Sequence, residues 1–441
     1  MSIQKIRVDG FKNILDTTIS FEKLVALVGL NNYGKSNILE AIDFAGDFIK
    51  ATPENKMELM SYTKAIPLNI KTAERNFNFE IEFLSTFKDK EIYINYEIEF
   101  EWPKNNKENN KENNELINPQ IVKEVLKLKE NTKGQKYNLH ISRDKDTAFY
   151  KSSETGRCDK AINITSDNLI INKLNNFDDL YYLDIINKLN NIKFDENIFL
   201  DTNSSFETSP IRFKRHSISG LNKRTGSNIA EIIYNLKIDD IDRYDTLVNS
   251  FKDLFPDIED IEAMSRSFKF KDEPKFEDDA PFVIMDTVYM IRVKESYTNQ
   301  YMNFDNLSSG TKRIFLLLTS AILADKNNVA LIAFEELEDC IHPKLFQQLL
   351  IILTEIIDNC KIIITSHSPF LIQYLALKDI YIGIPSKYGV AEFKKIKATK
   401  EKTVYRNAEN QGSSTGEYIF DLLDNAYDDD DDESNLLSFL E

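Results

Sequence analysis

The sequence predicts an α/β fold that combines a parallel sheet with antiparallel strands near the N-terminus and a helical lobe. Three observations lead to this prediction. A continuous apolar run at residues 24–28 precedes a glycine-containing turn and then apolar residues at helical spacing. Alternating apolar and polar residues over 77–102 are typical of antiparallel strands. Short apolar runs alternate with helical segments over 316–375, which is typical of a parallel sheet.

The N-terminal hundred residues predict strands around one helix. Residues 3–8 and 18–21 predict short strands, and the run at 24–28 predicts a strand buried on both faces. A helix is predicted where apolar residues recur at helical spacing over 38–49. The segments FNFEIEF and EIYINYEIEF, within 77–102, predict antiparallel strands.

The middle of the chain predicts an insertion followed by a helical lobe. Residues 104–115, KNNKENNKENNE, contain no apolar residue and predict a poorly ordered loop between strands. Residues 165–262 predict mostly helices, of which 227–236 and 244–255 are the clearest, and a strand-like stretch returns at 281–293.

The last third predicts the parallel sheet. Strands are predicted at 329–334 and 361–365, and helices at 316–323, 345–357 and 369–375. Their alternation predicts a sheet with helices on both faces.

Composition is that of a globular protein with more than one domain. The chain has 441 residues, too many for one ordinary core, with 42% hydrophobic and 29% charged residues. It contains no apolar run of 18 residues, so we expect no membrane span. The N-terminus lacks a charged-then-apolar leader, and we therefore expect a cytoplasmic protein.

Charge and cysteine content exclude several classes of site. A net charge of −17 repels nucleic acid on average, so any such contact must be local. Part of the excess comes from the run Asp428 to Glu433, for which a solvated tail is the first expectation. Three scattered cysteines, Cys158, Cys340 and Cys360, predict reduced thiols, and the four histidines have no metal-ligand spacing.

Residues 29–36, GLNNYGKS, match the pattern G-x-x-x-x-G-K-[ST] between a predicted strand and a predicted helix. Gly29 and Gly34 let the loop curl, so that its amides and the helix N-terminus bind phosphate oxygens. Lys35 then reaches the β- and γ-phosphates, and Ser36 places a hydroxyl on Mg²⁺. The other predicted nucleotide contacts are Asn31, Asn32 and Asn37.

Two carboxylates end the apolar run VALIAFEE at residues 329–336. A carboxylate at a strand end beside the phosphate loop can hold Mg²⁺ through water, the role predicted for Glu335. Its neighbour Glu336 can polarise the attacking water and is a candidate catalytic residue. An acidic turn without function is an equally good interpretation of this segment alone.

Two further segments carry polar residues that could contact a phosphate, one at the end of a predicted strand and one at the start of a predicted helix. KIIITSH, residues 361–367, ends in His367, whose imidazole can hydrogen-bond a γ-phosphate and act as a second candidate catalytic residue; helix capping by Ser366 or Ser368 is the alternative. LSSGT, residues 307–311, precedes an apolar helix and can bind an anion with free amides; an ordinary N-cap is the alternative. The candidate residues of this second segment are Ser308, Ser309 and Gly310.

The order and spacing of these motifs resemble the ABC-type ATPases, in the soluble branch that includes RecF, the SMC heads and the OLD-family ATPases. GLNNYGKSN resembles their Walker A motif and LSSG their signature motif. AFEELEDCIHP is similar to their Walker B motif and following loop, and ITSHSP to their switch-histidine motif. The opening KIRVDGFKNI resembles their N-terminal strand, and GSNIAEIIYNL to LFPDIEDI resembles the helical lobe ahead of the signature.

This resemblance implies an α/β P-loop NTPase head of the ABC type, with N-terminal antiparallel strands, a helical lobe and an inserted helical region. It implies ATP and Mg²⁺ as cofactors. It also implies a homodimer or higher homo-oligomer, in which the signature of one subunit completes the phosphate loop of the other. ATP would then close the pair and hydrolysis would separate it.

Three positions depart from the family pattern. Leu337 stands where proline is common, and Glu335 stands where the metal-binding residue is usually aspartate. No glutamine occurs between residues 5 and 119, so the glutamine that couples γ-phosphate to the helical lobe cannot be placed. The resemblance covers most of the chain except roughly residues 103–220 and the last 35.

The predicted organisation has five parts. These are the N-terminal part of the head at 1–102, an insertion with a low-complexity loop and helices at 103–226, a helical lobe with return strands at 227–300, the C-terminal part of the head at 301–405 and an acidic tail at 406–441.

Several functions compete. The RecF-like start and the long insertion disfavour a transporter subunit, and the lack of sustained heptads disfavours a long-armed SMC protein. OLD-family proteins carry a nuclease domain after the head, for which too few residues follow His367. We therefore expect a stand-alone ATPase without nuclease activity that controls a separate effector. The family resemblance implies a prokaryotic phage-defence or DNA-repair assembly.

A repair ATPase of the RecF type that binds DNA directly is the alternative function. Its candidate surface is the basic cluster of residues 210–226, although balancing the acidic remainder is the favoured role. The amphipathic segments 418–423 and 436–440 could dock a partner protein, but a free tail is slightly favoured. The basic residues of the cluster are Arg212, Lys214, Arg215, Lys223 and Arg224.

Overall fold

The computed structural model describes residues 1–105, 116–196, 206, 211–213, 229–267, 282–284, 286–338, 341–384, 388–428 and 436–441. The chain forms two compact units. The first comprises Met1–Glu196, Asn328–Leu337 and Asn359–Glu441, and the second comprises Asn197–Asn327 and Glu338–Asp358. Both large sheets belong to the first unit.

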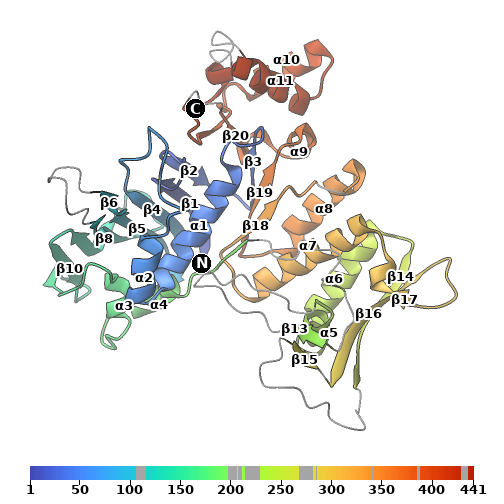
Figure 1. The fold of residues 1–441 in the computed structure, drawn as a ribbon, viewed down its shortest axis with the longest axis horizontal. Helices are drawn as coiled ribbons and strands as arrows, with labels where there is room; N and C mark the ends of the chain where they lie inside the picture. The colour runs from blue at the N-terminus through green and yellow to red at the C-terminus, as the bar shows by residue number, and fades with distance from the viewer. Residues whose placement is uncertain are drawn as a thin grey trace. The chain divides into compact units, whose positions relative to one another are not determined.

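An eight-stranded antiparallel sheet, with the order β11-β10-β9-β8-β5-β4-β1-β2, forms one part of the first unit (Figure 1). Its longest strands confirm the prediction for residues 77–102, because alternate side chains from Phe77 to Phe83 are buried. The strands are β1 (Ser2–Asp9), β2 (Thr17–Ser20), β4 (Phe77–Phe87), β5 (Lys90–Glu101), β8 (Gln120–Glu130), β9 (Asn138–Asp144), β10 (Thr147–Lys151) and β11 (Cys158–Ala161).

Strands β8 to β11 lie in the insertion and were not predicted. The segment EVLKLKE of β8 is rich in Glu, Leu and Lys, which favour helices, yet it pairs with β5 along its length. Cross-strand ion pairs use its charges: Lys123 lies 2.6 Å from Glu97, and Lys90 lies 2.7 Å from Glu130. Of the polar loop predicted at 104–115, only the first two residues are described, in the short strand β6 (Lys104–Asn105), which pairs with β7 (Leu116–Ile117).

The predicted parallel sheet is present and has six strands in the order β12-β18-β19-β3-β20-β21. All neighbouring pairs are parallel except β20 and β21. β3 is buried along its whole length, as its unbroken apolar run predicts. The strands are β3 (Leu24–Val28), β12 (Phe194–Glu196), β18 (Leu331–Glu335), β19 (Lys361–Ser366), β20 (Ile380–Gly383), which follows the 3₁₀ turn η2 (Leu377–Asp379), and β21 (Phe393–Lys395).

Helix α1 (Lys35–Lys50) joins the two sheets into one core. Its Phe44 and Phe48 contact Phe77 and Phe100 of the antiparallel sheet, with ring centroids about 5 to 6 Å apart. Its Gly46 leaves room for a side chain of β12, since a Cβ there would lie 2.6 Å from the ring of Phe194. The other helices in this N-terminal part of the unit are α2 (Pro53–Met60), α3 (Ile170–Leu174) and α4 (Leu183–Asn190).

The second unit contains the predicted helical lobe. Helices α5 (Ile229–Asp239) and α6 (Ile241–Leu254) confirm the two clearest middle helices, and α7 (Ser309–Lys326) and α8 (Pro343–Ile356) follow later in the chain. Its core is aromatic, with Phe304 and Phe315 at 4.5 Å between centroids. The remaining elements are β13 (Ile211–Phe213), β14 (Ile258–Ser267), β15 (Phe282–Ile284), β16 (Thr287–Glu295), β17 (Met302–Asn303) and the 3₁₀ turn η1 (Phe304–Asn306).

The C-terminal part is not a free tail, and that expectation was wrong. Helices α10 (Glu401–Gln411) and α11 (Thr415–Asp428) lie side by side, and α11 contacts α9 (Pro369–Tyr374) (Figure 1). Ile419 and Leu423 are buried on α11, and Leu436 and Leu440 are buried further on. These apolar side chains pack against the chain itself, so they are not available to a partner. Residues 429–435, which include all of the acidic run except Asp428, lie outside the described part of the chain.

Candidate nucleotide-binding site

The loop between β3 and α1 has the geometry of an anion cradle. Gly34 stands at the N-cap of α1 with a φ of 82°, a conformation that favours glycine. Gly34 has no side chain that could cap this helix, so an anion can take the place of an N-cap at its first turn. A Cβ at Gly34 would also lie 2.4 Å from the Cβ of Ala391, so both the backbone conformation and the available space require glycine.

Lys35 is held over this loop. Its side chain is only 8% exposed, and its Nζ donates hydrogen bonds to the carbonyl oxygens of Gly29 at 2.7 Å and Leu30 at 2.9 Å. A buried ammonium group with carbonyl acceptors is positioned for an incoming phosphate, which would be the stronger partner because it carries negative charge. The loop residues therefore fit a nucleotide triphosphate.

The register of the parallel sheet brings three predicted motifs together. Glu335, at the end of β18, pairs with Thr365 of β19, and Ser366 pairs with Val28 of β3. The amide of Gly29 donates to the carbonyl of Ser366 at 3.3 Å. Because these strands are parallel, the phosphate loop, the carboxylates and the histidine segment all start from one edge of the sheet.

Glu336 and His367 face each other at this edge. The Nδ1 atom of His367 lies 3.4 Å from Oε1 of Glu336, and the two side chains are 40% and 46% exposed, respectively. Glu336 has a φ of 46°, which is uncommon for a residue other than glycine. Its amide donates to the carbonyl of Thr365 at 3.0 Å, which holds the turn. Such backbone strain often occurs where a side chain must point in one direction for function.

The capping alternative at this segment also holds, without excluding the functional one. Ser366 is fully buried, and its Oγ accepts a hydrogen bond from the amide of Ser368 at 2.9 Å. The hydroxyl of Ser368 in turn accepts from the amide of Phe370 and caps α9. Both serines therefore have structural roles, and His367 lies between them.

Two residues near the phosphate loop were missed by the sequence analysis. Asn13 accepts a hydrogen bond from the side chain of Asn37 at 2.7 Å and donates to the carbonyl of Gly389 at 3.0 Å. Lys12 forms an ion pair with Glu40 of α1. Both lie in the FKN segment of the N-terminal strand motif, and its polar residues between apolar neighbours were the available signal.

The signature segment belongs to the second unit. Ser308 is the N-cap of α7, and its Oγ accepts from the amide of Thr311 at 3.2 Å, so the N-cap interpretation holds for this residue. Ser309 and Gly310 are the next two residues of the helix. Lys312 is 6% exposed, and its Nζ lies 3.0 Å from Oδ1 of Asp305, which orders the segment before the helix.

Other predicted positions are only partly described. Leu337, where the family commonly has proline, is fully buried. Within the basic cluster only Arg212 falls in a described element, β13, and the other four residues lie outside the described part of the chain. Cys340 also lies outside it.

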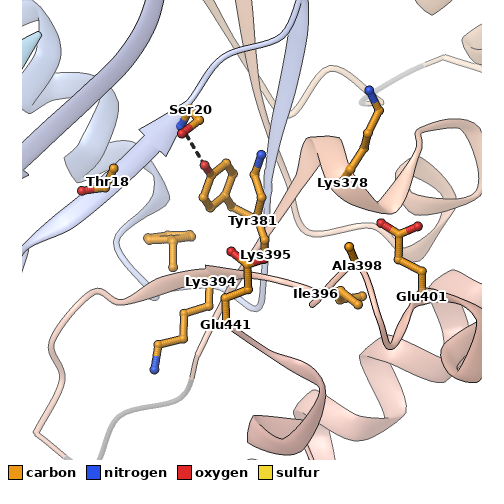
Figure 2. Close-up of a pocket in the computed structure, with 11 residues that line it drawn as sticks. Thr18, Ser20, Lys378, Tyr381, Lys394, Lys395, Ile396, Ala398, Glu401 and Glu441 are labelled. Atoms are coloured by element: carbon orange, nitrogen blue, oxygen red, sulfur yellow. Dashed lines mark hydrogen bonds between the residues drawn. The ribbon is translucent and has the colours of Figure 1, made fainter. Parts of the chain in front are cut away.

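A pocket of about 440 Å³ lies elsewhere in the first unit (Figure 2). It contains Lys378, Lys394 and Lys395, together with Tyr381, whose hydroxyl accepts from the amide of Ser20 at 2.7 Å. Carboxylates balance these lysines, since Glu401 and Glu441 also line the pocket. None of the predicted nucleotide-binding residues lines it.

Among the helices that the structure describes, none combines the length and the apolar character needed to cross a membrane.

Comparison with protein families identifies the chain. Residues 24–373 match the family model described as "AAA domain, putative AbiEii toxin, Type IV TA system". This match includes all four motifs and spans most of the chain. A search of curated protein sequences finds no significant match.

Three solved structures, all of SMC head domains, are similar to the chain. One is an SMC head bound to the C-terminal winged-helix domain of ScpA, at 14% identity, with 91% of this chain and 100% of that one covered and a TM-score of 0.47. The SMC head domain from Thermotoga maritima matches at 12% identity, with 90% and 100% covered and a TM-score of 0.39. An SMC head with an extended coiled coil, bound to the C-terminal domain of ScpA derived from Pyrococcus furiosus, matches at 13%, with 92% and 99% covered and a TM-score of 0.43.

At these identities and scores the three likenesses add no argument to the assignment. The family match identifies the chain, which belongs to this AAA-domain family and has the phosphate loop of a P-loop NTPase fold between β3 and α1.

Proposed function

We propose that this protein is a switch ATPase that closes as a homo-oligomer on ATP, hydrolyses it, and thereby controls a separate effector protein. The observation that carries the proposal is the meeting of the loop at Gly29, the pair Glu335 and Glu336, and His367 at adjacent ends of β3, β18 and β19. A phosphate cradle beside a carboxylate pair and an imidazole is the group of side chains that ATP hydrolysis needs.

Each residue has a role in this proposal. Lys35 and the amides at the N-terminus of α1 bind the β- and γ-phosphates. Ser36 and Glu335 would hold Mg²⁺, which would neutralise charge on the phosphates when bound. Glu336 orients and polarises water, and its distance of 3.4 Å from Nδ1 of His367 suits two groups that act on the same γ-phosphate and water.

The signature segment acts across subunits in this proposal. Ser309 and Gly310 open helix α7 in the second unit, away in sequence from the phosphate loop of the first unit. If the partner's signature segment completes the site, the closed oligomer binds ATP more tightly than the open subunits do. A ligand can shift an equilibrium between two states only through such a difference in affinity.

The effector is proposed to be a separate protein in a prokaryotic defence system, acting in the cytoplasm. The family description names a toxin–antitoxin system, which agrees with a role in a system of several components. In the sequence after His367, dense carboxylates occur only at Asp428 to Glu433, and no further histidine follows. This pattern supports the expectation that the chain itself has no nuclease activity.

The test measures oligomeric state and cleavage on the same purified protein. Light scattering should show that the Glu336→Gln variant becomes a stable larger species with ATP and Mg²⁺ but not with ADP. Incubation of the wild-type chain with DNA or RNA, Mg²⁺ or Mn²⁺ and ATP should leave the nucleic acid intact. Cleavage that disappears when Asp428 to Asp432 are replaced would overturn the proposal that a separate protein is the effector. An oligomeric state that does not change with ATP would overturn the proposal of an ATP-driven switch.

A further inference from the structure

We propose that Gly416 is a positioning residue for His367, and that through it the helical pair α10–α11 regulates ATP hydrolysis. This inference rests on the proposed function, since it takes His367 to act on the nucleotide. It adds a regulatory element that none of the sequence motifs contains.

The backbone of Gly416 lies directly against that of Pro369. A Cβ built on Gly416 would lie 2.0 Å from the carbonyl oxygen of Pro369, 2.8 Å from its carbonyl carbon and 3.2 Å from its Cα. Ordinary contacts of a Cβ are 3.4 Å or longer, so any larger residue would force the two backbones apart by roughly an ångström. Gly416 is the second residue of α11, and its close packing against Pro369 is the physical reason for glycine at this position.

Hydrogen bonds at the start of α11 hold Gly416 in place on its side of this contact. Ser414 and Glu417 form reciprocal hydrogen bonds at the start of α11: the Ser414 amide donates to Glu417 Oε2 at 2.8 Å, and the Glu417 amide donates to Ser414 Oγ at 3.2 Å. This capping box fixes the first turn of the helix, which contains Gly416. Tyr418, one turn in, accepts a hydrogen bond from Asn407 of α10 at 3.1 Å and is buried, which ties the two helices together.

Pro369 is connected to His367 by a short, hydrogen-bonded segment. Pro369 is the first residue of α9 and lies two residues after His367. The intervening Ser368 is fixed at its amide by the buried Ser366. A displacement of Pro369 therefore cannot be absorbed within a flexible loop, and it moves the His367 imidazole relative to Glu336.

Through this chain of contacts, a movement of helices α10 and α11 changes the position of His367 relative to Glu336. Because coupling between two sites is reciprocal, a nucleotide that repositions His367 must also shift α11. The exposed face of α11 carries Glu417, Asp421 and Asp424, so the helix that senses His367 also presents an acidic surface to solvent.

The test compares two glycines of the same helical pair. In Gly416→Ala the added methyl meets Pro369, whereas in Gly412→Ala, at the C-cap of α10, an added Cβ has no neighbour within 4 Å. We expect Gly416→Ala to lower kcat roughly 10- to 100-fold, as a misplacement of about an ångström does, while the Kd for ATP stays within twofold. Gly412→Ala has a strained φ of 68° and will lower Tm, but it should leave kcat within twofold.

A milder variant guards against misfolding. Ser414→Ala adds no atom and only loosens the first turn of α11, so we expect a smaller loss of kcat, about two- to fivefold, in the same direction. Hydrogen exchange provides a readout that does not need turnover: ATP should change the protection of residues 415–428 in Glu336→Gln protein, and Gly416→Ala should remove that change.

The outcomes separate this inference from the proposed function. Normal kcat in Gly416→Ala overturns the inference, as does an equal loss of kcat in both glycine variants, because that would reflect destabilisation alone. A wild-type protein that binds ATP without hydrolysing it overturns the proposed function. In that case, hydrogen exchange in α11 that does not change on ATP binding overturns the inference as well. An ATP-dependent change in the exchange of α11 that Gly416→Ala abolishes supports the inference.

Discussion

The Lys35 ammonium donates to two carbonyls of its own loop, so the main cation of the predicted site is in place before any nucleotide binds. Preorganisation of this kind lowers the entropy lost on binding. At the same residue scale, Glu336 holds its side chain on a strained backbone and faces His367. Each residue leads to a separate prediction.

Replacement of Lys35 by alanine should lower ATP affinity at least a hundredfold, a loss of roughly 3 kcal/mol, because the phosphates lose a charge-assisted partner. Titration calorimetry measures this directly. Lys50→Ala is the matched control, since Lys50 is an exposed lysine at the far end of the same helix. Equal affinity of the Lys35 variant and wild type would remove the site assignment.

Replacement of Glu336 by glutamine should leave ATP binding intact and slow hydrolysis roughly 10²- to 10⁴-fold, as loss of a general base does. Glu335→Gln should instead weaken the dependence on Mg²⁺, since its proposed role is at the metal. Phosphate release, measured against Mg²⁺ concentration, distinguishes the two. If Glu336→Gln hydrolyses normally and Glu335→Gln keeps its Mg²⁺ response, the division of roles is wrong.

At the scale of elements, the predictions from sequence succeeded where the signal was local. The loop at Gly34, helix α1 and strands β3, β18 and β19 each have a continuous pattern in a short window, and all are present. Strands β8 to β11 were not predicted. The Glu and Lys residues of β8 favour a helix, and its pairing with β5 makes it a strand. Strands β9 to β11 then pair in turn with β8, β9 and β10. The packing of α11 on α9 depends on a glycine that fits a distant backbone, which no local pattern reveals.

The position of the active groups was predictable only in part. Each motif identified candidate side chains within its own segment. The 3.4 Å distance between His367 and Glu336 depends on the register of β18 on β19, which no local sequence pattern predicts. Asn13 was missed for a similar reason, because its partner Asn37 is distant in sequence and the contact requires the tertiary fold.

Strand β9 carries a buried histidine that makes the first unit sensitive to acid. His140 is 5% exposed, and its Nε2 lies 2.8 Å from the hydroxyl of Tyr181. Burial lowers the pKa of His140 from 6.5 to about 4. Between these pH values the unfolded state takes up a proton that the folded state does not, so stability is lost as pH falls below 6.5.

We expect this histidine to cost about 2 kcal/mol of stability at pH 5 relative to pH 8. His140→Gln, which keeps a polar side chain but has no proton to gain, should lose less Tm over the same range. Carboxylates titrate alike in both proteins, so the difference between the two pH profiles isolates His140. Parallel Tm profiles would show that the imidazole is already accessible to protons in the folded state.

At the scale of the whole molecule, the predicted motifs fall in both units: the phosphate loop, Glu336 and His367 in the first, and the signature residues in the second. An oligomer that pairs the first unit of one copy with the second unit of another would use both. This arrangement can be tested with variants that each damage one half of the shared site.

Gly310→Trp should block hydrolysis but preserve ATP affinity, because the bulky side chain sits at the start of α7 and not in the phosphate loop. Mixed with Lys35→Ala, it should recover activity, since an intact phosphate loop can then meet an intact signature in one of the two sites. Activity measured over a titration of the two variants should pass through a maximum near equal amounts. No recovery at any ratio would mean that each site is complete within one chain.

Strand β3, which leads into the phosphate loop, hydrogen-bonds on one side to β19 and on the other to β20. Both neighbours are encoded more than three hundred residues later, at Lys361–Ser366 and Ile380–Gly383. A ribosome adds about 5 to 20 residues per second, so the strands that flank β3 are made tens of seconds after the phosphate loop. Nascent chains that end before Gly383 therefore lack both neighbours or one neighbour of β3, and we expect them to bind no nucleotide until β20 has been made.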